Sequence, residues 1–234
     1  MPNELLKFGK TNAKLEKIKQ WHQSRTYSIW ENELRFLTFS LPSGYACPSA
    51  KDCRSWYNPK TNKMSLHKDA KYTCYATTMQ RMTNVREQYW HNFNLLKPIR
   101  YDEIKITELL INSLVKNNKP DYVRIHESGD FFTEEYFKAW CNVARQLPEV
   151  TFYAYTKELK TVKKYQDEIP ENLVLTLSDG GKHDNLIDKI NIKKAVVVKN
   201  ANDTTLPIDD NEYHAIKTNE DFALVIHGTQ LKHK

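Results

Sequence analysis

The sequence predicts an α/β fold, a partial (β/α)6 TIM-like barrel with a cysteine-bearing loop after the first strand. Six short strand-like runs alternate with helix-like segments, and strands joined by helical crossovers pair in parallel. Five of the six glycines stand just after a predicted strand, where tight turns are needed. A length of 234 residues suits one domain of this kind. An open doubly wound sheet is the alternative architecture.

The predicted strands are apolar or alternating runs bounded by turn residues, at 36–41, 122–127, 151–156, 173–178, 195–199 and 222–227. The predicted helices carry apolar residues three and four positions apart, at 77–96, 104–117, 133–147, 159–169 and 183–190. A further helix is expected at 13–23. We therefore expect a single domain, 1–234, in which residues 1–35 are a helical extension and residues 36–234 the barrel-like core.

The composition indicates a globular protein that does not cross a membrane. Hydrophobic residues make up 40% of the chain, yet no apolar stretch approaches the ~20 residues of a membrane span. The lysine-rich N-terminus lacks the apolar centre of a signal peptide, so we expect a cytoplasmic protein. The net charge of +6 comes from interspersed charges without a run of five of one sign, so no nucleic-acid-binding tail is expected.

Three cysteines form the most informative motif. Cys47 and Cys53 follow the first predicted strand, and 20 residues separate Cys53 from Cys74. In a reducing compartment, spaced cysteines bind metals more often than they form disulfides. The segment 43–71 is polar and has too little apolar content to form a core of its own. A bound metal would explain how such a long segment stays ordered. We expect the three cysteines to be metal ligands, and three ligands leave one metal position open for chemistry.

Two metal groups suit these cysteines. Zinc bound by Cys47, Cys53, His67 and Cys74 is one, although a C-x5-C spacing is unusual for zinc. A [4Fe–4S] cluster held by the three cysteines is the other, and it is the one we favour. The fourth cysteine, Cys141, lies in an apolar helical stripe and is expected in the core, with a role as fourth ligand as the alternative.

Polar residues share one face of the second predicted strand. Because side chains alternate along a strand, Arg124, His126 and Ser128 should lie opposite its apolar residues, inside the barrel. Gly129 and Asp130 follow at the strand end, where α/β proteins place their sites. Buried polar groups require partners, so this row predicts a functional cavity.

Six stretches spread through nearly the whole chain carry a family resemblance: residues 39–53, 74–76, 90–93, 124–131, 152–157 and 222–229. Through them the chain resembles the bacterial and phage "gene product 88" family of small cysteine-containing proteins. The resemblance implies a phage or bacterial protein and names no reaction.

A more distant similarity is to radical S-adenosylmethionine enzymes. These are partial (β/α)6 barrels in which three cysteines after the first strand hold a [4Fe–4S] cluster. The open iron of that cluster binds S-adenosylmethionine, and a Gly-Gly-Glu motif after the second strand contacts its amine. Here Cys47, Cys53 and Cys74 follow the first predicted strand, and Ser128-Gly129-Asp130 ends the second. The spacing C-x5-C-x20-C differs from the family pattern C-x3-C-x2-C.

The first functional hypothesis is an iron–sulfur protein with a radical-SAM-like barrel and an unassigned small-molecule substrate, which leaves open whether it is an enzyme. In this hypothesis Asp130 holds an amine and Arg124 a carboxylate or phosphate, while His126 transfers a proton. The cluster is the expected cofactor, with S-adenosylmethionine as the candidate ligand of its open iron and zinc as the alternative. Further candidates lie in predicted strand-end loops: Ser128, Gly129 and Lys157 for cofactor binding, then Lys182 and His183.

Two other functions stay open. The first is a zinc- or cluster-stabilised nucleic-acid-binding protein without redox chemistry, because basic and aromatic side chains interleave on one predicted helix. These are Arg81, Arg86, Tyr89, Trp90 and His91, and packing against the barrel is the other explanation for the aromatics. The second is a hydrolytic metal site built from Glu127, Asp130 and His126, although a regular strand turns Glu127 away from His126.

Overall fold

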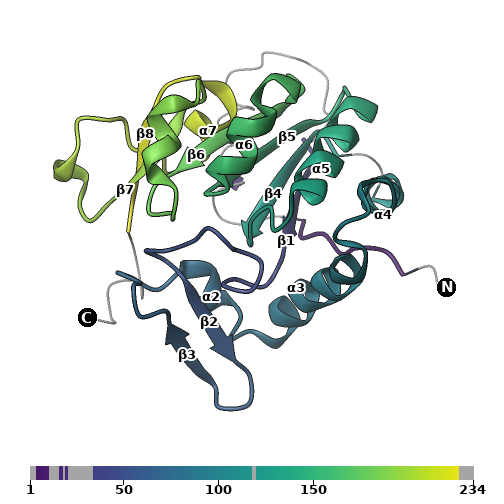
Figure 1. Ribbon diagram of the computed structural model, residues 1–234, viewed down its shortest axis with the longest axis horizontal. Helices are drawn as coiled ribbons and strands as arrows, with labels where there is room; N and C mark the ends of the chain where they lie inside the picture. The colour runs from purple at the N-terminus through teal and green to yellow at the C-terminus, as the bar shows by residue number, and fades with distance from the viewer. Residues whose placement is uncertain (1–3, 11–15, 18, 21–33, 118–119, 227–234) are drawn as a thin grey trace.

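A computed structural model describes residues 4–10, 16–17, 19–20, 34–117 and 120–226 of the chain. Its centre is a sheet of six parallel strands that lie side by side in chain order, β1-β4-β5-β6-β7-β8 (Figure 1). The strands are β1 (Phe36–Ser40), β4 (Tyr122–Ser128), β5 (Thr151–Thr156), β6 (Leu173–Ser178), β7 (Lys194–Val198) and β8 (Phe222–Val225).

The predicted parallel α/β architecture is confirmed in its coarse form. A doubly wound sheet reverses its strand order at a switch point, and the chain order seen here has no reversal. Among the described residues, β1 and β8 are not paired with each other, so the sheet is open and does not close into a barrel. No helix in the described part of the chain has the length and apolar character needed to cross a membrane.

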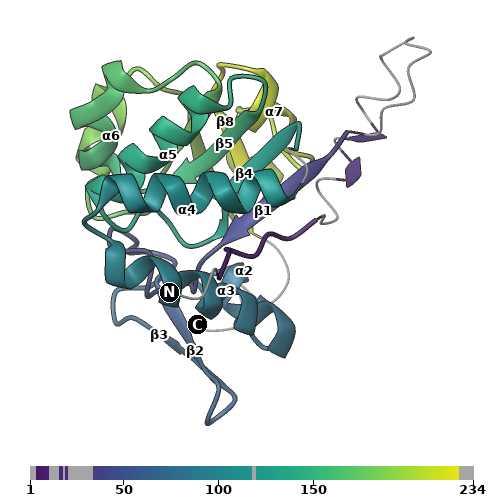
Figure 2. The same ribbon diagram turned by 90° about the vertical axis from the view of Figure 1, so that its right-hand side faces the viewer.

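Three helices cover one face of the sheet, and Figures 1 and 2 show them side by side: α4 (Glu103–Lys116), α5 (Glu134–Gln146) and α6 (Leu159–Tyr165). The side chains of Asp102 and Thr133 cap α4 and α5, accepting hydrogen bonds from backbone amides at 3.1 and 3.2 Å. The short η2 (Gln166–Glu168) extends α6, while predicted helix 183–190 is the 3-10 helix η3 (Asp184–Lys189).

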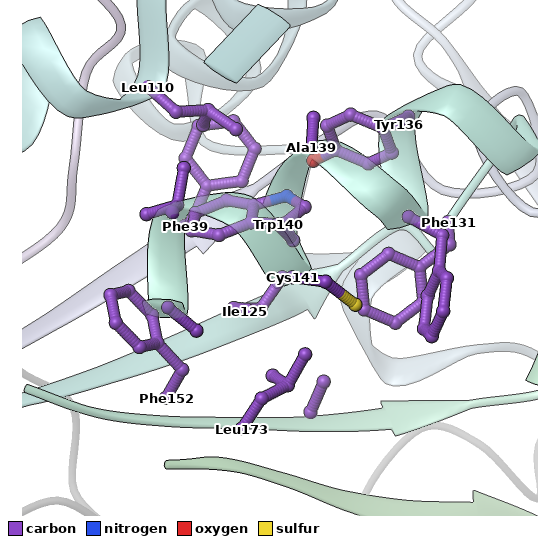
Figure 3. Packing of buried hydrophobic residues seen from close by; sticks show 14 of the residues in the cluster. Phe39, Leu110, Ile125, Phe131, Tyr136, Ala139, Trp140, Cys141, Phe152 and Leu173 are labelled. Carbon is purple, nitrogen blue, oxygen red and sulfur yellow. The ribbon is translucent and has the colours of Figure 1, made fainter. Parts of the chain in front are cut away.

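The main core lies between this sheet face and its helices. Trp140 of α5 is fully buried, and its ring meets Phe39 of β1 edge-on at 5.5 Å between centroids. Figure 3 shows Trp140 and Cys141 among apolar side chains of the sheet. Cys141 is 3% exposed, which confirms its predicted place in the core.

The opposite face of the sheet is covered differently. The short helix α7 (Tyr213–Lys217) packs against β5 and β6, and the 3-10 helix η4 (Ala201–Asp203) follows β7. A smaller cluster here includes Phe36 stacked on Tyr122 at 4.7 Å, together with Ala215 and Ile216. The sequence prediction did not include α7.

The segment after β1 contains structure that the sequence did not predict. An antiparallel hairpin, β2 (Ser55–Asn58) and β3 (Lys63–Leu66), projects from the body of the protein (Figure 2). Predicted helix 77–96 is two helices, α2 (Tyr75–Met79) and α3 (Thr83–Leu96), and the short η1 (Lys97–Ile99) follows. Predicted helix 13–23 lies largely outside the described residues. The predicted strand 222–227 ends at Val225 in the structure, and His227 lies outside the described residues.

Candidate functional site

The cysteine-bearing loop, residues 42–54, is fastened across the carboxyl ends of the strands. The Ala46 carbonyl accepts a hydrogen bond of 2.8 Å from the amide of Asp130, just past β4. The Gly180 carbonyl, just past β6, accepts bonds from the amides of Lys51 and Asp52 at 3.2 and 2.9 Å. The first two cysteines of the loop therefore lie at the edge of the sheet where α/β proteins bind ligands.

A buried carboxylate adds a second attachment. Glu158, at the start of α6, accepts hydrogen bonds from the amide and the hydroxyl of Ser49 at 2.8 and 2.7 Å. Burial raises the pKa of Glu158 to about 7, and the nearby Asp130 carboxylate acts in the same direction. The loop is thus tied to the end of β5 as well as to β4 and β6.

Cys74 is brought to this loop by a chain of hydroxyl groups. Its amide donates to the Ser55 hydroxyl at 3.1 Å, and that hydroxyl lies 2.8 Å from the Thr77 hydroxyl. The Thr77 hydroxyl is in turn 2.7 Å from the hydroxyl of Ser43, in the loop after β1. Because the two segments are joined in this way, Cys74 lies next to Cys53 although 20 residues separate them.

The three thiols lie together, and all three side chains are half-buried. Cys53 and Cys74 share a hydrogen bond, and Cys47 is near enough to both for electrostatic interaction, because the charge of Cys53 acts on Cys47 and that of Cys47 acts on Cys74. The bond from Cys74 lowers the pKa of Cys53 to about 7, and the Lys157 ammonium acts in the same direction. The same bond raises the pKa of Cys74, while burial raises that of Cys47.

A single-ion site is not formed by these side chains. Within the described residues, no three His, Cys, Asp or Glu side chains are arranged to hold one metal ion. The His67 ring lies 3.4 Å from an Asp69 carboxylate oxygen and 6.1 Å from the Trp56 ring. Neither His67 nor the core residue Cys141 is placed as a fourth ligand.

Asp130 and Lys157 join the strand ends beside the thiols. The buried Asp130 carboxylate accepts bonds from the Phe131 amide at 2.8 Å, the Thr156 hydroxyl at 2.7 Å and the Lys157 amide at 2.9 Å. The Lys157 ammonium donates to the Ser178 hydroxyl at 2.7 Å. Asp130 thus links β4 to β5, and Lys157 links β5 to β6.

The prediction that Arg124, His126 and Ser128 share one face is wrong at His126. Phe39 of β1 pairs with Ile125, but the next residue of β1, Ser40, pairs with Ser128. Two residues of β4 therefore bulge out of the ladder, and a bulge turns side chains to new directions. His126 adopts a left-handed backbone conformation with φ 66°, which is uncommon outside glycine.

The bulge sends its two side chains to different environments. His126 lies on the helix-covered face, where its Nε2 is 3.0 Å from the Tyr136 hydroxyl and its ring is 4.9 Å from Phe131. Burial lowers the pKa of His126 to about 3, so the ring is neutral. Glu127 lies near Tyr75 on the other side, since its charge raises the pKa of that tyrosine and the Tyr75 hydroxyl donates to the Glu127 carbonyl.

Arg124 has its predicted place on the face away from α4, α5 and α6. Its Nη1 lies 3.3 Å from a carboxylate oxygen of Glu212, and its guanidinium lies 5.5 Å from the centre of the Tyr155 ring. Glu212 is fully buried just before α7 and has a left-handed backbone, φ 65°. The ion pair is therefore shielded from water.

Further polar groups surround this ion pair. The Arg124 Nε, the Ser128 hydroxyl and the hydroxyls of Tyr153 and Tyr155 are buried without a hydrogen-bond partner among the described residues. We call Arg124, Ser128, Tyr153, Tyr155 and Glu212 the polar sheet face. Sequence reasoning missed both tyrosines and Glu212, although alternation along β5, which puts its apolar neighbours in the core, is a signal that could have found the tyrosines.

The two remaining candidates from the strand-end loops, Lys182 and His183, lie beside the cysteine-bearing loop. The Lys182 amide donates to the Ser49 carbonyl at 2.9 Å, and its ammonium donates to the Pro48 carbonyl at 2.6 Å. His183 precedes η3 and is half-buried. Lys182 therefore helps to hold the loop in place.

The aromatic side chains of α3 pack against the rest of the protein, which was the alternative to nucleic-acid binding for this helix. Tyr89 is 5% exposed, and Trp90 packs against the main core. Arg86 donates to the Gln80 carbonyl at 2.8 Å, and His91 is hydrogen bonded to a backbone carbonyl of the N-terminal segment. These contacts leave little of the helix for stacking on nucleic-acid bases.

Comparison with known proteins identifies the family. The sequence profile of the family described as "Gene product 88" matches residues 4–234. The chain belongs to the gene product 88 family. Two curated relatives are both named Gene 88 protein: that of Mycobacterium phage L5 is 31% identical over 111 residues, and that of Mycobacterium phage D29 is 32% identical over 90 residues.

The two alignments with these gene product 88 relatives are partial. They cover 45% and 36% of this chain, and 46% and 38% of the L5 and D29 relatives. The chain thus spans less than half the length of either relative in these matches. No solved structure matches the chain. The resemblance to the gene product 88 family is confirmed, and the similarity to radical S-adenosylmethionine enzymes finds no support in these comparisons.

Proposed function

We propose that this gene product 88 protein binds a [4Fe–4S] cluster through Cys47, Cys53 and Cys74, and that the polar sheet face holds a small-molecule substrate. The observation that carries the proposal is the meeting of three thiols, from two separate segments, at the carboxyl edge of a parallel sheet. Because the three cysteine residues are at least half-buried, a group bound there would be partly shielded from water.

The donor set suits a cluster better than a zinc ion. Structural zinc sites take four ligands around one point, and neither His67 nor Cys141 accompanies the thiols. The thiolates of a cluster bind different iron atoms and so need not converge on one point. Zinc therefore stays the alternative that requires a fourth ligand.

Charges of both signs lie beside the thiols, because the Asp130 carboxylate raises the pKa of Cys47 and Cys53 whereas the Lys157 ammonium lowers that of Cys53. Lys157 places a positive charge near Cys53, which would offset part of the negative charge of a thiolate-bound cluster. The loop is held next to Cys47 by the hydrogen bond that the Ala46 carbonyl accepts, and next to Cys53 by the bonds that the amides of Lys51 and Asp52 donate to the Gly180 carbonyl. The ligands would thus be held by a preformed scaffold.

When bound, the cluster would supply an iron without a protein ligand, at which a substrate or S-adenosylmethionine could bind. The residues of the chain would orient that ligand, with Arg124 and Ser128 on the polar sheet face. Glu127, which the bulge turns away from the core, replaces His126 as the candidate proton carrier. We also propose that the sheet is an open form of the partial (β/α)6 barrel, because its strands follow the same order.

The test is a visible absorption spectrum of protein purified without oxygen, before and after dithionite. The wild type should show broad absorbance that dithionite bleaches. Cys53→Ser should lose it, while the matched control Cys141→Ser, which changes the core cysteine, should keep it. Colourless protein that contains zinc would refute the cluster and favour the zinc alternative.

Radical chemistry is tested separately on the cluster-loaded protein. S-adenosylmethionine bound at the open iron should change the electron paramagnetic resonance spectrum of the reduced protein. An unchanged spectrum would contradict S-adenosylmethionine binding and leave the protein as a cluster-binding member of its family.

A further inference from the structure

The chain around the hairpin of β2 and β3 concentrates the positive charge of the protein. Residues 51–71 contain six lysines and arginines but two acidic residues, so these 21 residues carry +4 of the net charge of +6. The hairpin lies at the centre of this segment and projects from the body of the protein (Figure 2). We call residues 51–71 the basic hairpin.

The described residues neutralise only part of this charge. Lys60 in the turn, Lys63 at the start of β3 and Lys68 after β3 are exposed, and none of them forms an ion pair with a described carboxylate. Asp69 follows Lys68, but its carboxylate lies 3.4 Å from the His67 ring. Three ammonium groups are therefore available to a negatively charged partner.

The other acidic groups near the basic hairpin lie at its base. Asp52 forms an ion pair with Lys71 at 2.7 Å. The charges of Asp179 and Asp184, which follow β6, act on the same lysine. The end of the hairpin that projects from the body is thus the more positive end.

The turn at this end has a defined shape. The side-chain oxygen of Asn58 accepts hydrogen bonds from the amides of Lys60 and Thr61 at 2.9 and 3.4 Å. The Tyr57 hydroxyl donates to the side-chain oxygen of Asn62, whose φ is 53°. Such side-chain bonds hold a turn in one conformation. A partner would therefore meet a preorganised tip, which lowers the entropy cost of binding.

The two faces of the hairpin differ in character. Ser55 and Tyr57 face the body and are 0% and 7% exposed. Trp56 and Asn58 alternate with them and lie on the outer face, where Lys63 is the cross-strand partner of Asn58. No large apolar side chain of the basic hairpin is among the exposed ones. The outer face is therefore polar and basic.

This chemistry distinguishes between classes of partner. The centre of a protein interface is apolar and aromatic, and elements that bind a membrane surface insert apolar side chains into the lipid. The basic hairpin exposes no such side chains, whereas lysines bind nucleic-acid phosphates by displacing counterions. The major groove of DNA is about 12 Å wide and admits a two-stranded β-ribbon, while that of an RNA duplex is too narrow.

We infer that the basic hairpin binds double-stranded DNA, with its tip in the major groove and Lys60 and Lys63 on the phosphates. Asn58 and Asn62 use their side-chain oxygens within the turn, so their amide NH2 groups can donate to base edges or phosphates. The surface is separate from α3, whose aromatic side chains are used for packing. The inference goes beyond the proposed function and does not require a bound cluster.

Binding to a short labelled DNA duplex of mixed sequence, measured by fluorescence anisotropy, tests the partner. One strand of the same duplex is the first comparison, and co-sedimentation with vesicles of phosphatidylserine and phosphatidylcholine is the second. The duplex should bind most tightly. The logarithm of its affinity should fall linearly with the logarithm of the salt concentration, with a slope of about −0.9 for each phosphate contacted.

Paired substitutions test the surface. The double variant Lys60→Gln with Lys63→Gln should weaken duplex binding about tenfold or more at low salt and reduce the salt slope by about 2. The matched control is Lys160→Gln with Lys163→Gln, which removes the same charge from exposed positions of α6 and should bind as the wild type does. Both double variants should keep the wild-type melting temperature, because the four side chains are exposed.

Four results would overturn the inference. Wild-type protein that binds no duplex at low salt is the first, and tighter binding of the single strand than of the duplex is the second. Binding to the anionic vesicles in place of DNA is the third. An equal loss of affinity in the two double variants is the fourth, because it would show attraction by overall charge and no role for the hairpin.

Discussion

His126 should make the stability of the protein depend on pH below about 6.5. The side chain is 4% exposed, and burial lowers its pKa from 6.5 to about 3. Tyr136, the titratable group that faces it from α5, has a pKa raised by burial and stays neutral. The unfolded chain takes up a proton as the pH falls below 6.5, whereas the folded protein does not. The contribution of His126 to the free energy of unfolding is therefore complete above pH 6.5 and is lost as the pH falls toward 3.

The magnitude follows from the two pKa values. The interval from 6.5 to about 3, at about 1.36 kcal/mol per pH unit, sets an upper bound of about 5 kcal/mol. Between pH 7.5 and 4.5 the same linkage removes about 2.5 kcal/mol of the free energy of unfolding. This loss is a large part of the total free energy of unfolding of a single domain.

The perturbation is His126→Asn, because asparagine tolerates a left-handed backbone and does not titrate in this range. Urea unfolding at pH 7.5 and 4.5 gives the free energy of unfolding at each pH. The wild type should lose about 2.5 kcal/mol more than the variant on acidification. The matched control is His67→Asn, at a half-exposed histidine after β3, which should behave as the wild type does. An equal loss in His126→Asn and the wild type would refute the buried, neutral histidine.

Three further changes test the fold by chemical denaturation. Gly129→Ala should cost about 1–3 kcal/mol, because φ is 99° and the new Cβ would lie 2.8 Å from the Cβ of Leu41; wild-type stability would contradict this backbone geometry. Arg124→Met should cost about 3–5 kcal/mol by removing the guanidinium that forms an ion pair with the buried Glu212 carboxylate, and adding Glu212→Leu should recover most of it; equal stability of the single and double variants would argue against the pair. Trp140→Ala should cost about 3–5 kcal/mol, and a loss below about 1 kcal/mol would contradict its burial.

The strands of the sheet could be predicted because their periodicity is local. Strands β5 and β6 occupy the predicted residues, 151–156 and 173–178, since each is an apolar or alternating run between turn residues. The core position of Cys141 followed from the stripe on its helix in the same way. The order of the segments, and no local pattern, predicts that Cys74 lies near the other two cysteines, and in the structure it contacts Cys53.

The features that the sequence did not reveal depend on contacts between distant segments. Alternation assumes a regular strand, and the bulge at His126 is set by the pairing of β4 with β1. The hairpin of β2 and β3 is short and polar, so its sequence predicts an irregular loop. Glu212 lies in a segment without periodicity, so only the fold brings its carboxylate to Arg124.

The central claim is that Cys47, Cys53 and Cys74 hold an iron–sulfur cluster, and the most direct test is the iron and acid-labile sulfide content of anaerobically purified protein. The account predicts about four of each per chain in the wild type and close to none when the three cysteines are changed to serine. Wild-type protein without iron and sulfide, or the same content in the triple variant, would contradict it.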